Sequence, residues 1–475
     1  MADEKTIGIT VKKADDISEW YTQVIQKGEL AEYTDVSGCM VIRPRAYAMW
    51  EKVQEFFDAK IKKMGVANAY FPMLIPEHLL NKEKEHVEGF SPEVAWVTHG
   101  GNSKLSERLA IRPTSETIMY DSYKKWIRSH QDLPLKINQW CNIVRWEFKN
   151  PTPFLRGREF LWQEGHTVFS DEKEAEKEVW QIIDLYAAVM EDLFAVPVFK
   201  GRKTDVEKFA GAVFTASIET VLPQGKAIQV ATSHMLGQNF SKAFGITYLD
   251  KDEKKKHPFQ NSWGISTRAI GIMVMMHSDD KGLVIPPAVA PVHVVIVPIR
   301  PEKEVMDAVE RIRKDLHGYT VIVDDRKNYS PGFKFNDWEM KGIPIRIEIG
   351  PKDVKDDQVI LVRRDTGEKS AVKMTRVVDS VKHELDAIQK NLLVEARKRL
   401  EALIIDAKDI AGFKKALSEK RIVRSPFCMT KECEKKVAEM YSIKTLNFDP
   451  TAHAKGTCLH CGKEAKAVIC FGRSY

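Results

Sequence analysis

The sequence segment VRWEFKNPTPFLRGREFLWQEGHT, residues 144–167, concentrates arginines, glutamates and aromatic residues around a loop that contains prolines. If residues 144–148 form a strand, Arg145 and Glu147 point to the same face, because side chains alternate along a strand. A guanidinium beside a carboxylate is commonly an ordinary ion pair, and this pair alone indicates no chemistry. The residues that follow the pair determine whether it indicates more than an ion pair.

The second half of the segment adds positive charge and aromatic surface. Arg156 and Arg158 lie in the loop, and Phe160 follows it directly. Two strands joined by a basic loop form a cradle for phosphate groups, and an aromatic ring at its base can stack on a purine. A second alternation places three more side chains on one strand face, namely Trp162, Glu164 and His166.

Helices and strands of mixed order must hold this segment in place. Apolar residues recur at helical spacing after Pro44, which suits the first position of a helix, and Gly65 suits its end. An extended stretch with Pro72 follows, and a second amphipathic helix is predicted over residues 174–196. Up to about Gly282 strands and helices do not alternate regularly, which is typical of an α+β fold.

The proline-bearing stretch IPPAVAPVHVVIVPI marks a change of pattern. We predict a strand at 293–299, a helix at 302–317, three more strands, and a helix that starts near Ser380, which indicates a small α/β domain. The remaining residues are charged and helical, and then rich in cysteine. We therefore expect three domains, spanning residues 1–285, 286–398 and 399–475.

The composition is that of an ordinary globular protein. The chain has 475 residues and a formal net charge of +6, which gives only a mild preference for a polyanionic partner. It has no run of about 18 apolar residues, so no membrane span is expected. Its start, MADEKTIGITVKK, lacks the apolar core of a secretion signal, and we expect a cytosolic protein.

Five of the seven cysteines fall in the last fifty residues. In a cytosolic protein, paired thiolates at short spacing predict a closed structural Zn²⁺ site, with free buried thiols as the alternative. His460 lies inside the second pair, and Cys470 is a possible replacement ligand. The two pairs are Cys428 with Cys433, and Cys458 with Cys461.

Three stretches, in the right order, resemble the signature motifs of class II aminoacyl-tRNA synthetases. The helix and strand from Pro44 to Pro72 resemble the first motif, and VRWE followed by RGREF resembles the second. WGISTRAIGIMVMMHSDD, which contains Arg268, resembles the third. RPTSE, FLWQEGHT, KFAGAVFT, ATSHMLGQNF, GFKFNDWEMKGIPIRIEIGPKD and the cysteine-rich end are similar to the prolyl-tRNA synthetase family, in its archaeal and eukaryotic form. This resemblance covers essentially the whole chain.

The resemblance implies an enzyme that activates L-proline with ATP and transfers it to the 3′ end of tRNA(Pro). It implies an antiparallel-sheet catalytic core, an α/β anticodon-binding domain and a small α/β zinc-binding C-terminal domain. The nucleophile is a carboxylate that is already ionised, so the reaction needs positioning and charge neutralisation rather than a general base. The implied cofactors are ATP, Mg²⁺ and a structural Zn²⁺.

The resemblance also assigns roles at the nucleotide. Arg145 is implied to bridge the proline carboxylate and the α-phosphate, and Arg156 and Arg268 to hold the outer phosphates; Arg145 and Arg268 are the catalytic pair. Glu147 is implied to accept from the adenine amino group, and Phe160 to stack on adenine. The other residues implied at the nucleotide are Trp146, Gly157, Gln229, which is also implied at Mg²⁺, Thr232 and Ser266, where a threonine is expected.

The amino-acid site must accept two N–H bonds from a secondary ammonium and enclose a compact apolar ring. Thr114 and Glu116 share a face if the RPTSE stretch is extended. Trp162 and Phe209 are implied as walls of the ring, and ordinary core positions are the alternative for both. The implied polar side consists of Glu164, His166 and His234, a residue that would otherwise be a core histidine.

Partners follow from the same resemblance. The first motif forms the two-fold interface in this class, so we expect a homodimer. The interval between His166 and Gln229 is too short for the editing insertion of bacterial relatives, so no editing domain is predicted. Relatives place the terminal carboxylate near the active site, which gives Tyr475 a role at a domain interface. Candidates for reading anticodon bases are Arg326, Lys334, Asp337, Glu339, Arg346 and Glu348.

Two other hypotheses remain open. Another class IIa synthetase, such as a threonyl-tRNA synthetase, needs zinc ligands in the core, where the cysteines are only Cys39 and Cys141. A non-catalytic RNA-binding paralogue should have lost Arg145, Arg156 or Arg268, and all three are present. Neither a G-x-x-x-x-G-K-[ST] loop nor a dinucleotide fingerprint occurs, so generic ATPase and dehydrogenase functions have no support.

Overall fold

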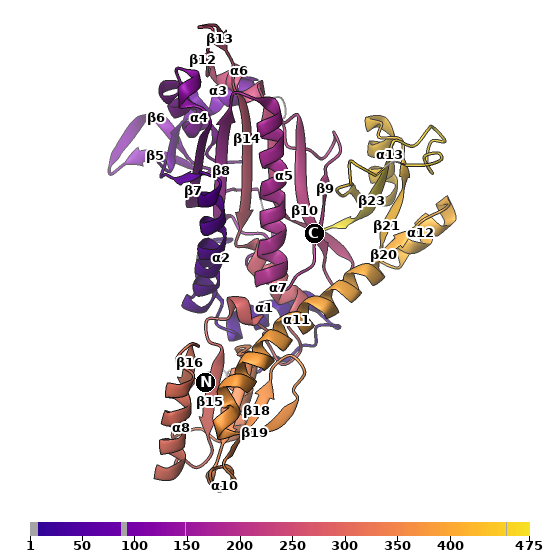
Figure 1. Cartoon of the computed structure of the whole chain (residues 1–475). Helices are drawn as coiled ribbons and strands as arrows, with labels where there is room; N and C mark the ends of the chain where they lie inside the picture. The colour runs from indigo at the N-terminus through magenta and orange to yellow at the C-terminus, as the bar shows by residue number, and fades with distance from the viewer. Residues whose placement is uncertain (1–7, 87–92, 148, 453) are drawn as a thin grey trace.

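A sheet of eleven strands forms the centre of the molecule (Figure 1). The structure is a computed structural model that describes residues 8–86, 93–147, 149–452 and 454–475. Within residues 67–266, six strands pair antiparallel in the spatial order β9-β10-β11-β14-β8-β7, with β3 parallel to β7. Their bounds are β3 Ala67–Asn68, β7 Leu135–Val144, β8 Glu159–Phe169, β9 Phe199–Arg202, β10 Phe214–Val221, β11 Lys226–Gly237 and β14 Phe259–Ser266.

The helices α2 (Pro44–Lys63), α5 (Glu172–Ala188) and α7 (Arg268–His277) share one apolar core with this sheet. The Asp171 side chain caps α5 by accepting from the backbone N–H of Glu174. Because residues three and four apart lie on one side of a helix, α5 presents a single apolar stripe to β10, β11 and β14. The buried stripe is Val179, Ile182, Ile183 and Tyr186.

A smaller layer closes one end of the sheet. The strands β4 (Leu74–Pro76), β6 (Ser103–Ile111) and β5 (Trp96–Gly100) pair antiparallel. Apolar residues of α4 (Glu116–Trp126) and α6 (Asn239–Phe244) form a second core with this layer. The other elements of the first 285 residues are α1 Ile17–Lys27, β1 Ala31–Tyr33, β2 Met40–Ile42, α3 Glu77–His86, β12 Tyr248–Leu249 and β13 Lys255–Lys256, of which α1 packs in the core of the large sheet.

The next region is a five-stranded sheet in the order β16-β15-β17-β18-β19. Its first three strands are parallel and the last two antiparallel, with helices packed on them. Its elements are β15 Val294–Pro298, α8 Lys303–Asp315, β16 Val321–Val323, α9 Pro331–Met340, β17 Ile345–Ile349, α10 Pro351–Lys355, β18 Gln358–Arg363 and β19 Lys369–Lys373.

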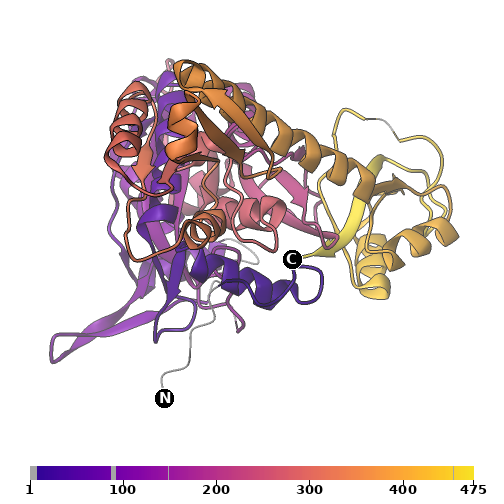
Figure 2. The same ribbon diagram turned by 90° about the horizontal axis from the view of Figure 1, so that it is seen from below.

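A long helix, α11 (Val377–Leu403), connects this sheet with the C-terminal region, as Figure 2 shows from below. There β23 pairs antiparallel with β21 and parallel with β11 of the core, where Lys226 lies opposite Arg473. The large sheet is therefore continuous between the two regions. The C-terminal elements are β20 Ile404–Asp406, α12 Ile410–Ser418, β21 Ile422–Phe427, α13 Lys431–Tyr441, β22 Lys444–Thr445 and β23 Ala467–Ser474.

The structure confirms the α+β class and the α/β second region, but two local predictions are wrong. The strand predicted at 144–148 ends at Val144, because its partner β8 begins opposite it at Glu159 and offers no further register. Glu147 lies in a turn, and Phe148 is outside the described residues. The RPTSE stretch is not extended to its end, because Glu116 is the first residue of α4.

Other boundaries differ in smaller ways. The helix predicted at 174–196 begins at Glu172, and after Ala188 it continues as one π-helical turn to Leu193. Helix α9 was not predicted, although Ser330 caps it by accepting from Phe333 N. Among the described residues, no helix is both long enough and apolar enough to cross a membrane.

Candidate active site

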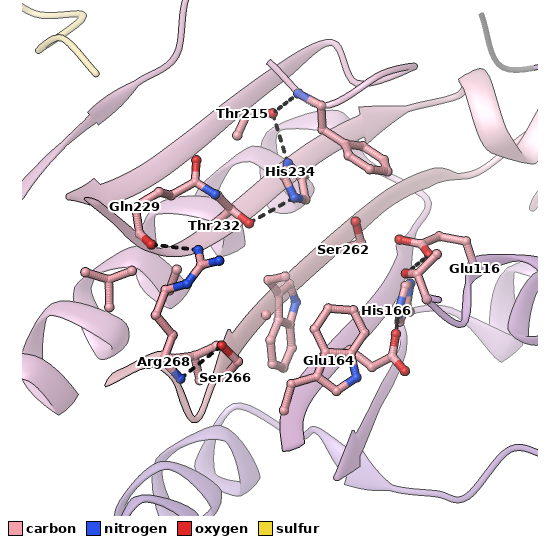
Figure 3. A pocket seen from close by; sticks show the side chains of 18 of the residues that line it. Glu116, Glu164, His166, Thr215, Gln229, Thr232, His234, Ser262, Ser266 and Arg268 are labelled. Carbon is pink, nitrogen blue, oxygen red and sulfur yellow. Dashed lines mark hydrogen bonds and ion pairs between the residues drawn. The ribbon is translucent and has the colours of Figure 1, made fainter. Parts of the chain in front are cut away.

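A cavity of about 310 Å³ opens on the large sheet (Figure 3). Along β8, Gln163 and Thr167 hydrogen-bond to Tyr186 and Glu178 of α5, so the alternating side chains point away from α5. Those side chains line the cavity together with residues of β10, β11, β14 and α7. The lining contains most of the predicted residues: Thr114, Glu116, Arg145, Phe160, Trp162, Glu164, His166, Phe209, Gln229, Thr232, His234, Ser266 and Arg268.

One end of the cavity is acidic. Glu116, Glu164 and His166 are buried, and each brings one polar atom within 4.8 Å of the others. His166 Nε2 lies 3.1 Å from Glu164 Oε2, and its Nδ1 lies 3.1 Å from the Tyr120 hydroxyl. Two carboxylates beside one imidazole leave an excess of negative charge, which suits an ammonium group.

Neighbouring polar groups hold these carboxylates in place. Thr114 donates its hydroxyl hydrogen to Glu116, and Ser115 donates its own to Glu164. Gln139 Nε2 donates to Glu164 Oε1 at 3.1 Å. Because Thr114 and Ser115 directly precede α4, the start of that helix fixes both carboxylates in one geometry.

The Glu164–His166 contact changes the pKa of both groups. Burial alone raises the pKa of Glu164, but hydrogen bonds from His166, Ser115 and Gln139 and the charge of His166 bring it below its ordinary value. Burial alone lowers the pKa of His166, but Glu164 and Glu116 together raise it above its ordinary value. Both shifts favour the charged forms, an imidazolium beside a carboxylate.

The pKa of His234 shifts in the opposite direction to that of His166. Burial lowers its pKa to about 3, and the charges of His166 and Arg145 act in the same direction. Its Nδ1 lies 2.9 Å from the Thr215 hydroxyl and its Nε2 3.0 Å from the Thr232 hydroxyl, as Figure 3 shows. The neutral ring packs against Phe209, with 4.6 Å between the ring centroids.

Two arginines also line the cavity, and Arg268 lies across it from Glu116 and His166 (Figure 3). Arg145 donates from Nε to the carbonyl oxygen of Pro113 at 3.0 Å, and its guanidinium lies 5.4 Å from the ring centroid of Trp162. Arg268 donates from Nη1 to the main-chain oxygen of Gln229 at 3.1 Å. Burial lowers the pKa of Arg268 to about 10, with further lowering by Arg145, so Arg268 remains a cation at neutral pH. Two partly buried cations suit phosphates.

Four predicted site residues do not line the cavity: Trp146, Glu147, Arg156 and Gly157. Trp146 is half exposed and stacks under Arg158 at 4.4 Å, and Glu147 is exposed. Gly157 lies in an adjacent hollow of about 260 Å³. Arg156 lies beside Tyr475, to whose main-chain oxygen it donates from Nη2 at 2.9 Å.

The four paired cysteines come together in the C-terminal region. Each Sγ atom of Cys428, Cys433, Cys458 and Cys461 lies within 4.8 Å of the others. The Cys433–Cys458 and Cys428–Cys461 separations are 3.9 and 3.5 Å, close to the ~3.8 Å edge of a tetrahedron with Zn–S bonds of about 2.3 Å. The donor set fits Zn²⁺.

The two alternative ligands lie outside this cluster. Cys470 packs in a separate apolar cluster, where burial raises its pKa to about 12. The His460 ring packs on Phe413, with 4.8 Å between centroids, and its Nε2 atom has no hydrogen-bond partner among the described groups.

The six anticodon candidates form ion pairs with one another or with neighbours in the five-stranded region. Arg326 binds Asp324 and Asp337 at 2.7 and 2.8 Å. Arg346 binds Glu348 at 2.9 Å and Glu339 at 3.3 Å. The remaining candidate, Lys334, is buried and donates to the main-chain oxygen of Asp324.

The sequence interpretation missed several residues of the cavity wall. Glu207 and Thr215 line it, and so do Ser262 and Trp263 of β14. Thr215 ends the KFAGAVFT stretch and Trp263 begins the third motif, but neither was assigned to the site. Their placement depends on strand pairing: Thr215 lies opposite His234 in the β10–β11 register. The available signals were the membership of Thr215 and Trp263 in those stretches and the nearness of Glu207 to Phe209 in sequence.

Comparisons with known proteins agree with this geometry. Residues 96–277 match the class II tRNA synthetase core domain (G, H, P, S and T), and 293–384 match the anticodon binding domain. Residues 410–475 match the prolyl-tRNA synthetase C-terminal domain. The cytoplasmic proline–tRNA ligase of Arabidopsis thaliana is 50% identical, over 99% of this chain and 92% of the relative. The chain belongs to the prolyl-tRNA synthetase family.

Other members of the family match this chain along their whole length. The proline–tRNA ligase of Cenarchaeum symbiosum is 47% identical, over 99% of this chain and 100% of the relative. The crystal structure of prolyl-tRNA synthetase from Cryptosporidium parvum, complexed with halofuginone and AMPPNP, superposes with a TM-score of 0.95 at 47% identity, over 99% of this chain and 100% of that one. Membership of this family removes the threonyl alternative.

Proposed function

We propose that this prolyl-tRNA synthetase activates L-proline with ATP to prolyl-adenylate and transfers the prolyl group to the 3′ end of tRNA(Pro). One observation carries the proposal. A single cavity is lined by an acidic cluster that suits an ammonium and by the cations Arg145 and Arg268, and Arg268 lies across the cavity from Glu116 and His166 (Figure 3). This polarity orients an amino acid with its carboxylate toward the phosphates of ATP.

The step requires no proton transfer, because the attacking carboxylate is already ionised. A carboxylate oxygen forms a bond to the α-phosphorus while the bond to the bridging oxygen of pyrophosphate breaks. Arg145 is assigned to the carboxylate and the α-phosphate, and its Nη atoms have no hydrogen-bond partner among the described residues. Arg268 is assigned to the outer phosphates, where a preorganised cation stabilises the developing charge.

The proline site is assigned to the acidic end of the cavity. Glu116 and Glu164 accept from the secondary ammonium, with Thr114 and His166 as their supports. Neutral His234 adds no positive charge to this end. The walls of the ring slot are assigned to Trp162 and Phe209.

The nucleotide site is assigned to the cationic end. Phe160 stacks on the adenine, and Gln229, Thr232 and Ser266 surround the phosphates, with Gln229 offering an oxygen to Mg²⁺. Mg²⁺, when bound, supplies additional neutralisation of phosphate charge. The AMPPNP in the Cryptosporidium relative supports ATP as the nucleotide. Trp146, Glu147, Arg156 and Gly157 lie just outside the cavity and are assigned to its rim, to be contacted once ATP is bound.

The division into residues 1–285, 286–398 and 399–475 assigns catalysis, anticodon binding and structural Zn²⁺ to successive regions. The anticodon bases are assigned to the network of Arg326 and Arg346, whose guanidinium and carboxylate edges match base edges. Zn²⁺ is assigned to the four clustered cysteines. No editing domain is included, and rapid unaided hydrolysis of alanyl-tRNA(Pro) would contradict this.

We also propose a homodimer in the cytoplasm. Tyr70, near the end of the stretch that resembles the first motif, is 73% exposed, and Met73 and Leu74, which directly follow that stretch, are each 37% exposed. Trp126, 48% exposed, lies beside Phe71 at 5.8 Å. An exposed apolar patch of this kind suits burial against a second copy. The Arabidopsis relative, named cytoplasmic, supports the location.

Amino-acid-dependent ATP–pyrophosphate exchange, across all twenty amino acids and without tRNA, tests the function. Strong exchange with proline alone is expected. Strong exchange with a different amino acid would retain the reaction type and overturn the pocket assignment. No exchange by a folded, zinc-loaded protein would favour an RNA-binding protein without catalysis.

A further inference from the structure

The segment 204–213 forms part of the cavity wall without belonging to a helix or a strand. It carries Glu207 and Phe209, both of which line the cavity. The Phe209 ring contacts His234, and its backbone N–H donates to the Thr215 hydroxyl at 2.9 Å. Such a segment has few regular backbone hydrogen bonds, so other contacts must hold its shape.

Residues of the C-terminal region supply those contacts. The Thr204 hydroxyl donates to Oε1 of Glu434 on α13 at 2.5 Å, although 230 residues separate the two in sequence. Lys444 Nζ lies 3.3 Å from Glu207 Oε2. The C-terminal region therefore contacts the segment both at its start and at a residue of the cavity wall.

Glu434 occupies the centre of this contact. Its side chain is buried, and Oε1 also accepts from the Thr445 hydroxyl. Thr204 Oγ1 in turn accepts from the backbone N–H of Glu207 at 3.3 Å, which carries the contact into the cavity wall. Removing a buried acceptor leaves its donors unsatisfied, so the segment should then rearrange.

We propose that Glu434 is a positioning residue for the amino-acid pocket, acting from the C-terminal region through Thr204 to hold Glu207 and Phe209 in place. This inference rests on the proposed function of the cavity. It gives the C-terminal region a part in proline binding, because the wall segment is shaped from outside the core. Glu434 itself does not line the cavity.

Other residues attach the C-terminal region to the catalytic core. Asn447 Nδ2 donates to the main-chain oxygens of Phe199 and Ser217 at 3.1 and 2.9 Å. Phe448 and Arg202 exchange two backbone hydrogen bonds. These contacts attach the region to β9 and β10 without contacting 204–213, so they separate a docking effect from a positioning effect.

Matched variants test the proposal in proline-dependent pyrophosphate exchange. Glu434→Ala and Thr204→Val should each raise the KM for proline about tenfold and change the KM for ATP less than about twofold, because small misplacements at a binding wall are costly. Glu434→Gln and Thr204→Ser keep the acceptor and the donor, and should stay within about twofold of the parent. Thr204 lies outside α13, so its effect cannot come from the cysteine cluster. Asn447→Ala is the docking control.

Two kinetic results would overturn the proposal. One is a KM for proline within about twofold of the parent in both Glu434→Ala and Thr204→Val. The other is an Asn447→Ala enzyme that reproduces their KM change, because docking alone would then explain it.

Backbone hydrogen exchange of residues 204–213 is a readout that requires no activity. The amides of this segment should exchange faster in Glu434→Ala and Thr204→Val than in the parent, Glu434→Gln and Asn447→Ala. Unchanged exchange in the first two variants overturns the positioning role. Failure of the proposed function would instead appear as no proline-dependent activity in the parent, so the two failures are distinguishable.

Discussion

Arg156 and Tyr475 join distant parts of the chain beside the cavity. Nη2 of Arg156, in the loop between β7 and β8, donates at 2.9 Å to the main-chain oxygen of Tyr475, which directly follows β23. The Arg156 guanidinium also lies 5.9 Å from the Tyr475 ring centroid, and Lys226 Nζ lies 5.6 Å from it on a neighbouring strand. The last residue of the sequence therefore helps to fix an arginine assigned to the outer phosphates of ATP.

Deleting Tyr475 should raise the KM for ATP about tenfold, because Arg156 loses an interaction worth about 1.5–3 kcal/mol for a charged donor. Tyr475→Ala removes the ring but keeps the main-chain oxygen, so its KM for ATP should rise only about threefold. Pyrophosphate exchange at varied ATP concentration measures both. Equal effects of the two variants would show that the main-chain contact does not contribute.

Arg268→Ala should lower kcat for pyrophosphate exchange about 10²- to 10³-fold, because a preorganised cation is lost from the phosphate end of the cavity. Arg268→Lys keeps the charge but cannot donate to Leu155 and Gln229 with the same planar group, so a smaller loss is expected. Single-turnover formation of prolyl-adenylate gives the rate directly.

The matched control is Arg158→Ala, which removes an arginine of the β7–β8 loop that stacks on Trp146 instead of lining the cavity. Its kcat should remain within a few-fold of the parent. A loss as large as that of Arg268→Ala would contradict the assignment of these two arginines to different roles.

Part of this site could be predicted from the sequence because local periodicity sets it. The alternation of Trp162, Glu164 and His166 needs only one strand, and the structure places all three along the cavity. The same alternation rule predicted that Glu147 shares a strand face with Arg145. That prediction is wrong, because strand β7 ends at Val144, opposite the first residue of β8. The rule holds only where a neighbouring strand continues the register.

Contacts between segments that are far apart in the sequence could not be predicted from local periodicity. Ser115 and Gln139 hold Glu164 from two separate segments, and neither has a periodicity that points to the other. The contact between Thr204 and Glu434 spans 230 residues and depends on where β23 joins the large sheet. The cysteine pairs are the exception, because the geometry of a tetrahedral metal site imposes its own spacing on the sequence.

Cys461→Ser should abolish stoichiometric zinc binding or weaken it strongly, because one of four clustered thiolates is lost. The thermal transition of the C-terminal region should fall with it, since metal binding contributes to folding energy. Cys470→Ala is the matched control, because Cys470 lies outside the cluster and should leave the zinc content unchanged. Elemental analysis after dialysis against a mild chelator gives the stoichiometry, and loss of zinc in Cys470→Ala would reassign the ligands.

Tyr70→Glu should weaken self-association by at least tenfold, because it places a charge in the exposed patch assigned to the dimer interface. Met440→Glu changes a side chain that is 69% exposed on α13, far along the chain from that patch, and should leave association unchanged. Sedimentation velocity over a range of protein concentrations measures the dissociation constant. A monomeric parent would contradict the interface altogether.

The buried His234 predicts a specific loss of stability in acid. Its pKa is about 3 in the folded protein, whereas an unfolded histidine titrates near 6.5. As pH falls below 6.5, the unfolded chain binds a proton at this histidine and the folded chain does not. The free energy of unfolding therefore falls from pH 6.5 toward pH 3. By pH 4.5 this amounts to about 2–3 kcal/mol. His234→Gln should therefore lose about that much less stability than the parent between pH 7 and pH 4.5, as measured by urea unfolding. His317→Gln changes an exposed histidine and should lose as much stability as the parent between pH 7 and pH 4.5. A loss in His234→Gln as large as the parent's would contradict a neutral buried ring.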